Sequence, residues 1–196
     1  MERRRRRKED LSSLMRKSWY HLRLSVRHPS RVPTWDAIIL TAASPEQAHL
    51  YTSQLNRAKR MGRISPSTLT LAVPDPLGCR IGSGAATLNA LHALSLHYAA
   101  NVLAGKHVLL LHAGGDSKRV PWANPMGKVF LPLPFLADDE PDGPVPLLFD
   151  HILAVASCAR QAFRDQGLLY MHSLFYLHFL VYILRAVWIN NLFYSL

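Results

Sequence analysis

The chain has 196 residues, 49% of them hydrophobic, and a formal net charge of +10. This length can bury a real core in one domain, but it is short for an enzyme that binds two substrates. Residues 1–34 carry most of the positive charge, so the basicity belongs to an N-terminal arm and not to the body. No aromatic residue interrupts the RRRRRK run to stack on bases, which argues against specific nucleic-acid recognition.

Other broad classes are excluded by short motifs that are missing. No apolar segment directly follows the N-terminal charges, so no secretory signal peptide is predicted. Cys79 and Cys158 are too few and too far apart for a disulfide framework or a zinc site. The ten histidines include no HExxH pattern, and no metal ligands are assigned. A reduced, cytoplasmic setting is therefore expected.

Short apolar runs and helical patterns alternate along the body of the chain. Ser44 is the expected N-cap of a helix that runs to about Arg60, with Pro45 in its first turn. The other expected elements are a short basic helix before the Pro-rich linker that ends at Pro33, strands at 35–42, 68–73 and 107–113, a helix from a glycine loop to about Ala100, and a helix at 146–163. This order predicts an α/β domain with a mostly parallel, Rossmann-like sheet, in which ligands bind outside the carboxyl ends of the strands.

Two glycine motifs fall at those strand ends. Gly82-Ser83-Gly84 follows the second expected strand, and Gly114-Gly115 follows the third. The first motif is no dinucleotide fingerprint, because a threonine, Thr87, takes the place of its third glycine. The second does not open a P-loop, since the segment before Gly127-Lys128 lacks the required glycine and a valine follows the lysine. No GxSxG nucleophile elbow occurs either.

The second motif is followed by two cations. Adjacent glycines let backbone N–H groups approach a base or a phosphate without a Cβ in the way. Arg119 offers a planar fork to phosphate oxygens, and Lys128 adds a point charge. Together they match a triphosphate and the charge that develops as pyrophosphate leaves.

The segment HAGGDSKRVPWANPMGK (112–128) resembles the signature loop of the sugar-1-phosphate nucleotidyltransferases, which reads Gly-Gly, a small-residue loop, Arg and then Pro-Lys. Here Gly127 stands where most relatives have proline. This variation, together with IGSGAATLNAL (81–91), is similar to the narrower family of L-fucokinase/GDP-L-fucose pyrophosphorylases, above all the plant bifunctional type. The likeness runs from about Arg7 to Gly167.

The resemblance implies a nucleotide-diphospho-sugar transferase fold and a role in L-fucose salvage. In that family, L-fucose 1-phosphate attacks the α-phosphorus of GTP, and pyrophosphate leaves with the help of Mg²⁺. By position, the residues implied to act are Arg119 and Lys128 as catalytic phosphate-binding cations, Gly114 and Gly115 against the guanine nucleotide, and Gly82, Ser83, Gly84 and Thr87 as a backbone wall of the same site.

The resemblance ends near Gly167. Relatives continue with a strand that closes on Gly-Asp, whose carboxylate holds the metal, whereas this chain continues with LLYMHS. The sugar-binding half and the kinase domain are not found either. Residues 35–167 are therefore interpreted as the N-terminal nucleotide-binding part of a fucose-1-phosphate guanylyltransferase, without its metal ligand and inactive as this chain. The alternatives are a non-catalytic nucleotide-binding or interaction fragment and a tail-anchored membrane protein.

Residues 168–196 form a divergent hydrophobic tail with three interpretations. Positions 168–184 approach the length of a membrane-spanning helix, which needs about 20 apolar residues. The second interpretation is unselected sequence from a truncated isoform or a gene-model artefact, and the third is a buried strand pair. Oligomeric state and sugar preference do not follow from the sequence.

Overall fold

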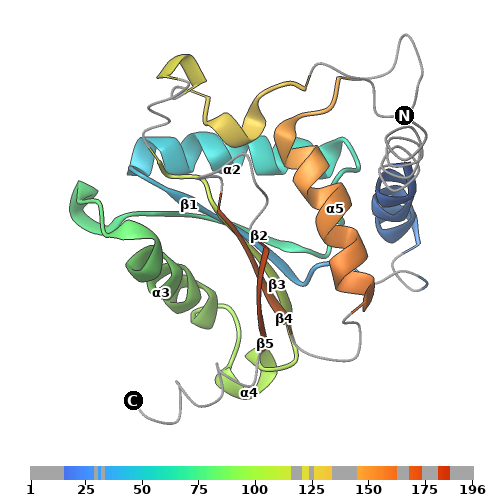
Figure 1. The fold of residues 1–196 in the computed structure, drawn as a ribbon. Coiled ribbons are helices and arrows are strands. Elements are labelled where there is room, and N and C mark those ends of the chain that lie inside the picture. The colour runs from blue at the N-terminus through green and yellow to red at the C-terminus, as the bar shows by residue number, and fades with distance from the viewer. Residues whose placement is uncertain are drawn as a thin grey trace, which may run out of the picture.

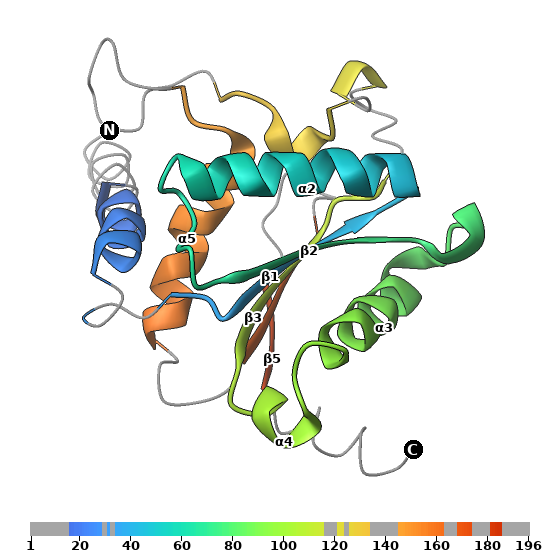
Figure 2. The same ribbon diagram turned by 180° about the vertical axis from the view of Figure 1, so that it is seen from behind.

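The computed structural model describes residues 16–28, 31, 34–115, 121–123, 126–133, 145–162, 168–173 and 181–185. These residues form a five-stranded sheet in the order β2-β1-β3-β4-β5, with helices on both faces (Figures 1 and 2). Four strands are parallel, and β5 runs antiparallel to β4 at one edge. The expected α/β class with a mostly parallel sheet is confirmed.

The elements alternate as the sequence predicts. The strands are β1 (Ala37–Ala42), β2 (Leu69–Pro74), β3 (His107–His112), β4 (Leu168–Ser173) and β5 (Val181–Arg185). The helices are α2 (Pro45–Arg60), α3 (Gly82–Ser95), α4 (Ala100–Leu103) and α5 (Leu148–Ala162), with 3₁₀ turns η1 (Pro76–Gly78), η2 (Pro121–Ala123) and η3 (Lys128–Phe130). A further helix spans residues 16–27.

The start of α2 is determined locally. The Ser44 side chain accepts a hydrogen bond from the Gln47 backbone N–H, and the Gln47 side chain accepts one from the Ala43 N–H. These two bonds satisfy donors that a helix start otherwise leaves unpaired. The cap therefore fixes the angle at which the chain leaves β1, and it confirms the predicted N-terminus.

Side chains on β3 point alternately to the two faces of the sheet, as strand geometry requires. Leu109 and Leu111 join the cluster beneath α2 and α5, whereas Val108 and Leu110 join the cluster beneath α3 and α4. All four are buried. The central strand is thus covered on both faces, which explains its continuous apolar sequence.

The helix at residues 16–27 packs onto the domain, although the arm to which it belongs was expected to lie outside the body. Trp19 and Leu22 are buried in the same cluster as α2 and α5. The Ser157 hydroxyl, which donates to the Ala154 carbonyl oxygen, also lies 3.5 Å from the Ser18 carbonyl oxygen, and Arg160 Nε donates to the Thr34 carbonyl oxygen at 3.1 Å. Figure 1 shows this blue helix beside α5.

The helix α3, which contains the first glycine motif, differs from the expectation at both ends. Gly82, Ser83 and Gly84 form the first turn of α3 and not a loop before it. The helix ends at Ser95 and not near Ala100, because the chain turns so that the Tyr98 hydroxyl reaches the Asp36 carbonyl oxygen at 3.4 Å. The next four helical residues form the separate α4.

The tail contributes two strands to the sheet. Leu168–Ser173 pairs in parallel with β3, and Val181–Arg185 pairs with β4. This agrees with the strand-pair interpretation of the tail. Within the described ranges, no helix has the length and apolar character that crossing a bilayer requires.

Candidate functional site

The carboxyl ends of β1, β2 and β3 meet at one edge of the sheet. In register, His112 at the end of β3 lies beside Thr41 of β1, which in turn lies beside Val73 of β2. Figure 1 shows this edge at the left, with η1 and the first turn of α3 on one side and η2 on the other. Both predicted glycine motifs lie here.

Packing against the end of β1 requires a glycine at position 114. A Cβ on this residue would lie 2.6 Å from the Ala42 carbonyl carbon and 2.7 Å from the Ala43 nitrogen. Real Cβ atoms do not approach backbone so closely. The turn after β3 therefore needs Gly114 to pass the end of β1, and Gly115, which is half-buried, follows it directly.

At position 84, by contrast, packing does not require a glycine. The Gly84 backbone does not adopt a positive φ, and, apart from its chain neighbours and the backbone of its own helix, no heavy atom of the described residues lies within 4 Å of the position where its Cβ would be. Gly82 also faces open space, but its φ of +74° favours glycine by itself. Ser83 between them is exposed, and Ile81 gives the helix no side-chain cap. The first turn of α3 thus presents bare backbone to solvent.

Thr87 connects α3 to β3. Its hydroxyl donates to the Ser83 carbonyl oxygen at 2.9 Å, one turn earlier, and lies 3.2 Å from His112 Nε2. His112 is 9% exposed, and burial lowers the pKa of its imidazole, although the charge of Asp75 opposes the shift. The imidazole is therefore neutral at pH 7.

Tyr51 of α2 holds the two ends of the signature loop. Its hydroxyl donates to the Ala113 carbonyl oxygen at 3.1 Å, and its ring stands where a Cβ of Gly127 would be. Tyr51 is fully buried, and burial raises the pKa of its phenol. The Phe130 ring meets the Tyr51 ring edge-on, with centroids 5.5 Å apart.

The Gly-Lys pair that replaces the usual Pro-Lys has a conformational explanation. Gly127 has φ +76°, which proline, held near −65°, cannot adopt. Val129 and Phe130 are buried in η3, which leaves Lys128 half-buried at the start of this turn. Lys128 thus directly follows Gly127, which packs against the Tyr51 ring. Arg119 lies outside the described residues.

The described residues do not supply a metal site. They contain no group of three or more His, Cys, Asp or Glu side chains that could hold an ion. Asp75 directly follows β2 at the glycine edge, a strand-end acid that was not singled out in the sequence. The described residues therefore offer no all-protein cage for the Mg²⁺ that the resemblance implies.

Asp150 lies in the first turn of α5 and makes two close polar contacts there. Its Oδ2 accepts from Arg63 Nη1 at 2.6 Å and from the Leu147 N–H at 2.8 Å. Burial raises the pKa of Asp150, while Leu147 and Arg63 oppose the shift. This carboxylate is a structural partner of Arg63 at the start of α5.

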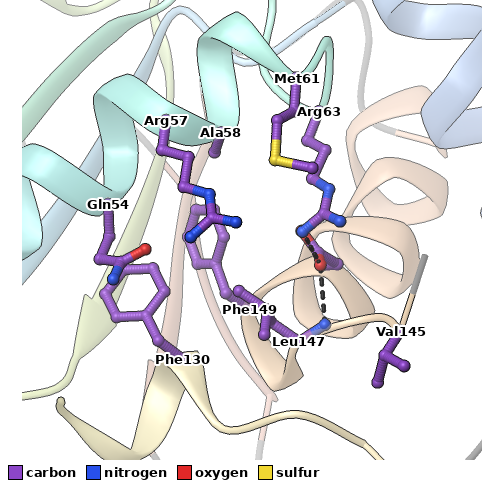
Figure 3. Close-up of a pocket in the computed structure, with 10 residues that line it drawn as sticks. Gln54, Arg57, Ala58, Met61, Arg63, Phe130, Val145, Leu147 and Phe149 are labelled. Atoms are coloured by element: carbon purple, nitrogen blue, oxygen red, sulfur yellow. Dashed lines mark hydrogen bonds and ion pairs between the residues drawn. The ribbon is translucent and has the colours of Figure 1, made fainter.

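A small cavity lies beside this ion pair. Gln54 and Arg57 of α2 and the next residue after that helix, Met61, face it from one side, and Phe130 and Leu147 from the other (Figure 3). Asp150 Oδ2 accepts from both Arg63 and Leu147, and dashed lines in Figure 3 mark these two bonds. The cavity is lined from the second half of α2, away from the glycine edge, where α2 begins.

Comparisons with known proteins agree with this arrangement. A sequence model of the fucose pyrophosphorylase domain matches residues 100–179, which include β3, the glycine turn, α5 and β4. The bifunctional fucokinase/GDP-fucose pyrophosphorylase of Arabidopsis thaliana is 71% identical over 85% of this chain. The chain belongs to the fucose pyrophosphorylase family.

More distant members of this family are similar over half of the chain. The fucose-1-phosphate guanylyltransferases of mouse and human are each 35% identical over 51% of it. The chain spans 18% of the length of the plant relative, 17% of the mouse protein and 16% of the human protein. No solved structure matches the chain.

Three residues at this family's glycine edge were not singled out in the sequence: Tyr51, Asp75 and His112. His112 directly precedes the Ala-Gly-Gly turn, which was a usable signal for a buried polar group at a strand end. Tyr51 carried no such signal, because it occupies an ordinary buried position of an amphipathic helix.

Proposed function

We propose that this chain binds a guanine nucleotide at the carboxyl edge of its parallel sheet, in a site that serves guanylyl transfer from GTP to L-fucose 1-phosphate. The relatives carry names for that activity: GDP-fucose pyrophosphorylase and fucose-1-phosphate guanylyltransferase. The chain covers less than a fifth of their length, so the proposal for the chain itself is nucleotide binding.

The observation that carries the proposal is Gly84. Glycine in a helix costs roughly 0.5–1 kcal/mol relative to alanine. Neither backbone conformation nor packing against the described residues requires glycine at this position. A group that approaches the backbone from outside gives the missing reason, because a Cβ would keep it away.

The chemistry at this edge suits a phosphate group. The first turn of α3 has no side-chain cap, and helix N-termini favour anions through their N–H groups and the helix dipole. Lys128 supplies a point charge near the end of the signature loop, and Arg119, within that loop, is proposed to supply a second. The role of Gly114 and Gly115 against the nucleotide remains part of the same proposal.

The test is GTP binding by calorimetry on the 196-residue chain, with and without Mg²⁺. Arg119→Ala and Lys128→Ala should each weaken binding about ten- to a hundredfold, since a charge-assisted contact is worth about 1.5–3 kcal/mol. Arg60→Ala is the matched control, because Arg60 is an exposed cation in the last turn of α2, at the other end from the glycine edge. Equal affinity with and without both loop cations would refute the site.

Turnover is a separate measurement. Release of pyrophosphate from GTP is followed with and without L-fucose 1-phosphate, against a reaction that lacks protein. We propose that the chain binds GTP without turnover, because LLYMHS stands where the relatives are expected to have the Gly-Asp strand end that holds the metal. Pyrophosphate release that depends on both the protein and the sugar phosphate would contradict this.

A further inference from the structure

Within the described part of the chain, a hydrogen bond between Thr87 and His112 joins α3 directly to the end of β3. Their side chains come from positions 25 residues apart, and the Thr87 Oγ1 to His112 Nε2 distance is 3.2 Å. Thr87 lies one turn after Ser83, whose carbonyl oxygen accepts the Thr87 hydroxyl proton. His112 lies two residues before Gly114. The pair therefore connects the bare first turn of α3 to the glycine turn after β3.

The direction of this hydrogen bond follows from proton counting. A threonine hydroxyl has one proton to donate, and the Thr87 proton goes to the Ser83 carbonyl oxygen. With its proton donated in this way, Thr87 Oγ1 accepts from the imidazole, which fits a neutral His112 that carries its proton on Nε2 and leaves Nδ1 unprotonated. A chain of two hydrogen bonds that ends in the first turn of α3 then favours this tautomer of His112.

Strand pairing on both sides holds the backbone of His112 in place. His112 is the last residue of β3, paired in register with Thr41 on one side and Ser173 on the other. By strand alternation its side chain belongs to the face that Val108 and Leu110 share, which is the face that α3 covers. A movement of the α3 first turn away from the sheet would have to break the bond to Thr87.

We infer that His112 and Thr87 are positioning residues for nucleotide binding: their hydrogen bond holds the first turn of α3 in register with the glycine turn after β3. The inference rests on the proposed function, because it assumes that both turns contact the same nucleotide. It explains why a polar, nearly buried imidazole ends the central strand of the sheet. It also gives Thr87 a role other than part of a backbone wall.

The experiment is a double-mutant cycle on GTP affinity in the full chain. Thr87→Val removes the hydroxyl with little change of shape, His112→Phe removes the ring nitrogens, and Thr87→Ser retains the hydroxyl. Each disruptive single variant should raise the Kd for GTP three- to tenfold, the double variant should raise it no further than either single variant, and Thr87→Ser should stay within twofold of wild type. Additive effects, or a Thr87→Val variant with wild-type affinity, would overturn the inference.

Thr52→Val provides the matched control. Thr52 makes the same bond to the carbonyl oxygen four residues earlier, from Oγ1 to Ala48 at 2.9 Å, but no described side chain bridges it to another element. Its GTP affinity should stay within twofold of wild type. A loss of affinity equal to that of Thr87→Val would mean that helix stability, and not the link to His112, is responsible.

Nitrogen-15 spectra of the His112 imidazole give a readout that does not depend on the nucleotide. At pH 7.5 they should show the Nε2-protonated tautomer in wild type and a mixture of tautomers in Thr87→Val. A dominant Nδ1-protonated form in wild type would refute the hydrogen-bond chain. A wild-type chain that binds no GTP refutes the proposed function and the role of the pair with it, whereas wild-type binding that Thr87→Val leaves unchanged refutes the present inference alone.

Discussion

The Tyr51 hydroxyl donates to the Ala113 carbonyl oxygen, 62 residues away in the sequence, at 3.1 Å. The ring of the same side chain occupies the space that any side chain at Gly127 would need. One residue of α2 thus holds both the beginning and the end of the loop between Ala113 and Gly127. A loop whose two ends are fixed has fewer conformations available to it, and this preorganisation would favour the proposed nucleotide binding.

Removing the Tyr51 hydroxyl should destabilise the protein. Tyr51→Phe leaves the buried Ala113 carbonyl without this donor, which costs about 1–3 kcal/mol in the free energy of unfolding. Urea titration measures the loss. Tyr98→Phe is the control, because it removes a longer hydrogen bond, 3.4 Å, to a carbonyl at the opposite edge of the sheet. If both variants reduced GTP affinity equally, Tyr51 would have no special relation to the loop.

A side chain at Gly127 should be poorly tolerated. Gly127→Ala places a Cβ against Tyr51 and forces a non-glycine residue to φ +76°, which alone costs about 1–2 kcal/mol. Thermal unfolding should show the loss. Gly105→Ala is the matched control, since its nearest non-bonded atom would be 3.9 Å away and its φ is not positive. A stable Gly127→Ala variant with wild-type GTP affinity would contradict the loop geometry.

Two glycines at the candidate site should respond in opposite ways to the same substitution. Gly114→Ala should lower the free energy of unfolding, because its Cβ meets the backbone of Ala42 and Ala43. Gly84→Ala should raise it by roughly 0.5–1 kcal/mol and yet weaken GTP binding. Unfolding and calorimetric titrations on both variants check this. A Gly84→Ala variant that binds GTP as well as wild type would remove the main support for the proposed site.

The Arg63–Asp150 ion pair should matter for folding. The side chains of Arg63 and Asp150 are 18% and 2% exposed, so Arg63→Met leaves an unpaired buried carboxylate, at a cost of about 3–5 kcal/mol. Adding Asp150→Asn should recover much of this loss, because the amide carries no charge. Urea unfolding of the single and double variants measures the recovery. A double variant as unstable as Arg63→Met would show that the cost has another origin.

Asp36 should make stability depend on pH in the acid range. Burial raises the pKa of Asp36, but hydrogen bonds from His107 and Lys106 outweigh it and hold the pKa well below its usual value. A lowered pKa stabilises the folded state above the unfolded value of about 4, and this contribution is lost as pH falls below it. Asp36→Asn should therefore be less stable than wild type at pH 7, with the difference shrinking by pH 3. If the difference in stability between Asp36→Asn and wild type were the same at pH 7 and pH 3, an ionic origin would be excluded.

The elements near the site could be predicted because their signals are local. Ser44 and Pro45 mark the start of α2, and the apolar run 107–113 marks β3, each within a few neighbouring residues. The start of α3 was predicted too late along the chain, because Gly82 and Gly84 suggested a loop where the structure has a helical turn. Glycine composition alone does not distinguish these conformations.

The contacts that organise the site could not be predicted. Tyr51 and Ala113 meet across 62 residues, and Thr87 and His112 across 25, so only the completed sheet brings them together. For the same reason the sequence could not tell a glycine required by packing, Gly114, from one that faces open space, Gly84. The apolar tail allowed three interpretations, a membrane helix, unselected sequence or a strand pair, and pairing with β3 places its first part in a strand.

The uncapped start of α3 has a consequence for hydrogen exchange. Its first turn combines two glycines with exposed backbone, and the Thr87 hydroxyl is its first fixed contact with the sheet. Without ligand, the amides of residues 82–85 should exchange with solvent at rates set by local fraying and not by global unfolding. A nucleotide seated on this turn would slow their exchange selectively, while the amides of β3 remained protected in both states. The least protected part of the helix would then report directly on whether the site is occupied.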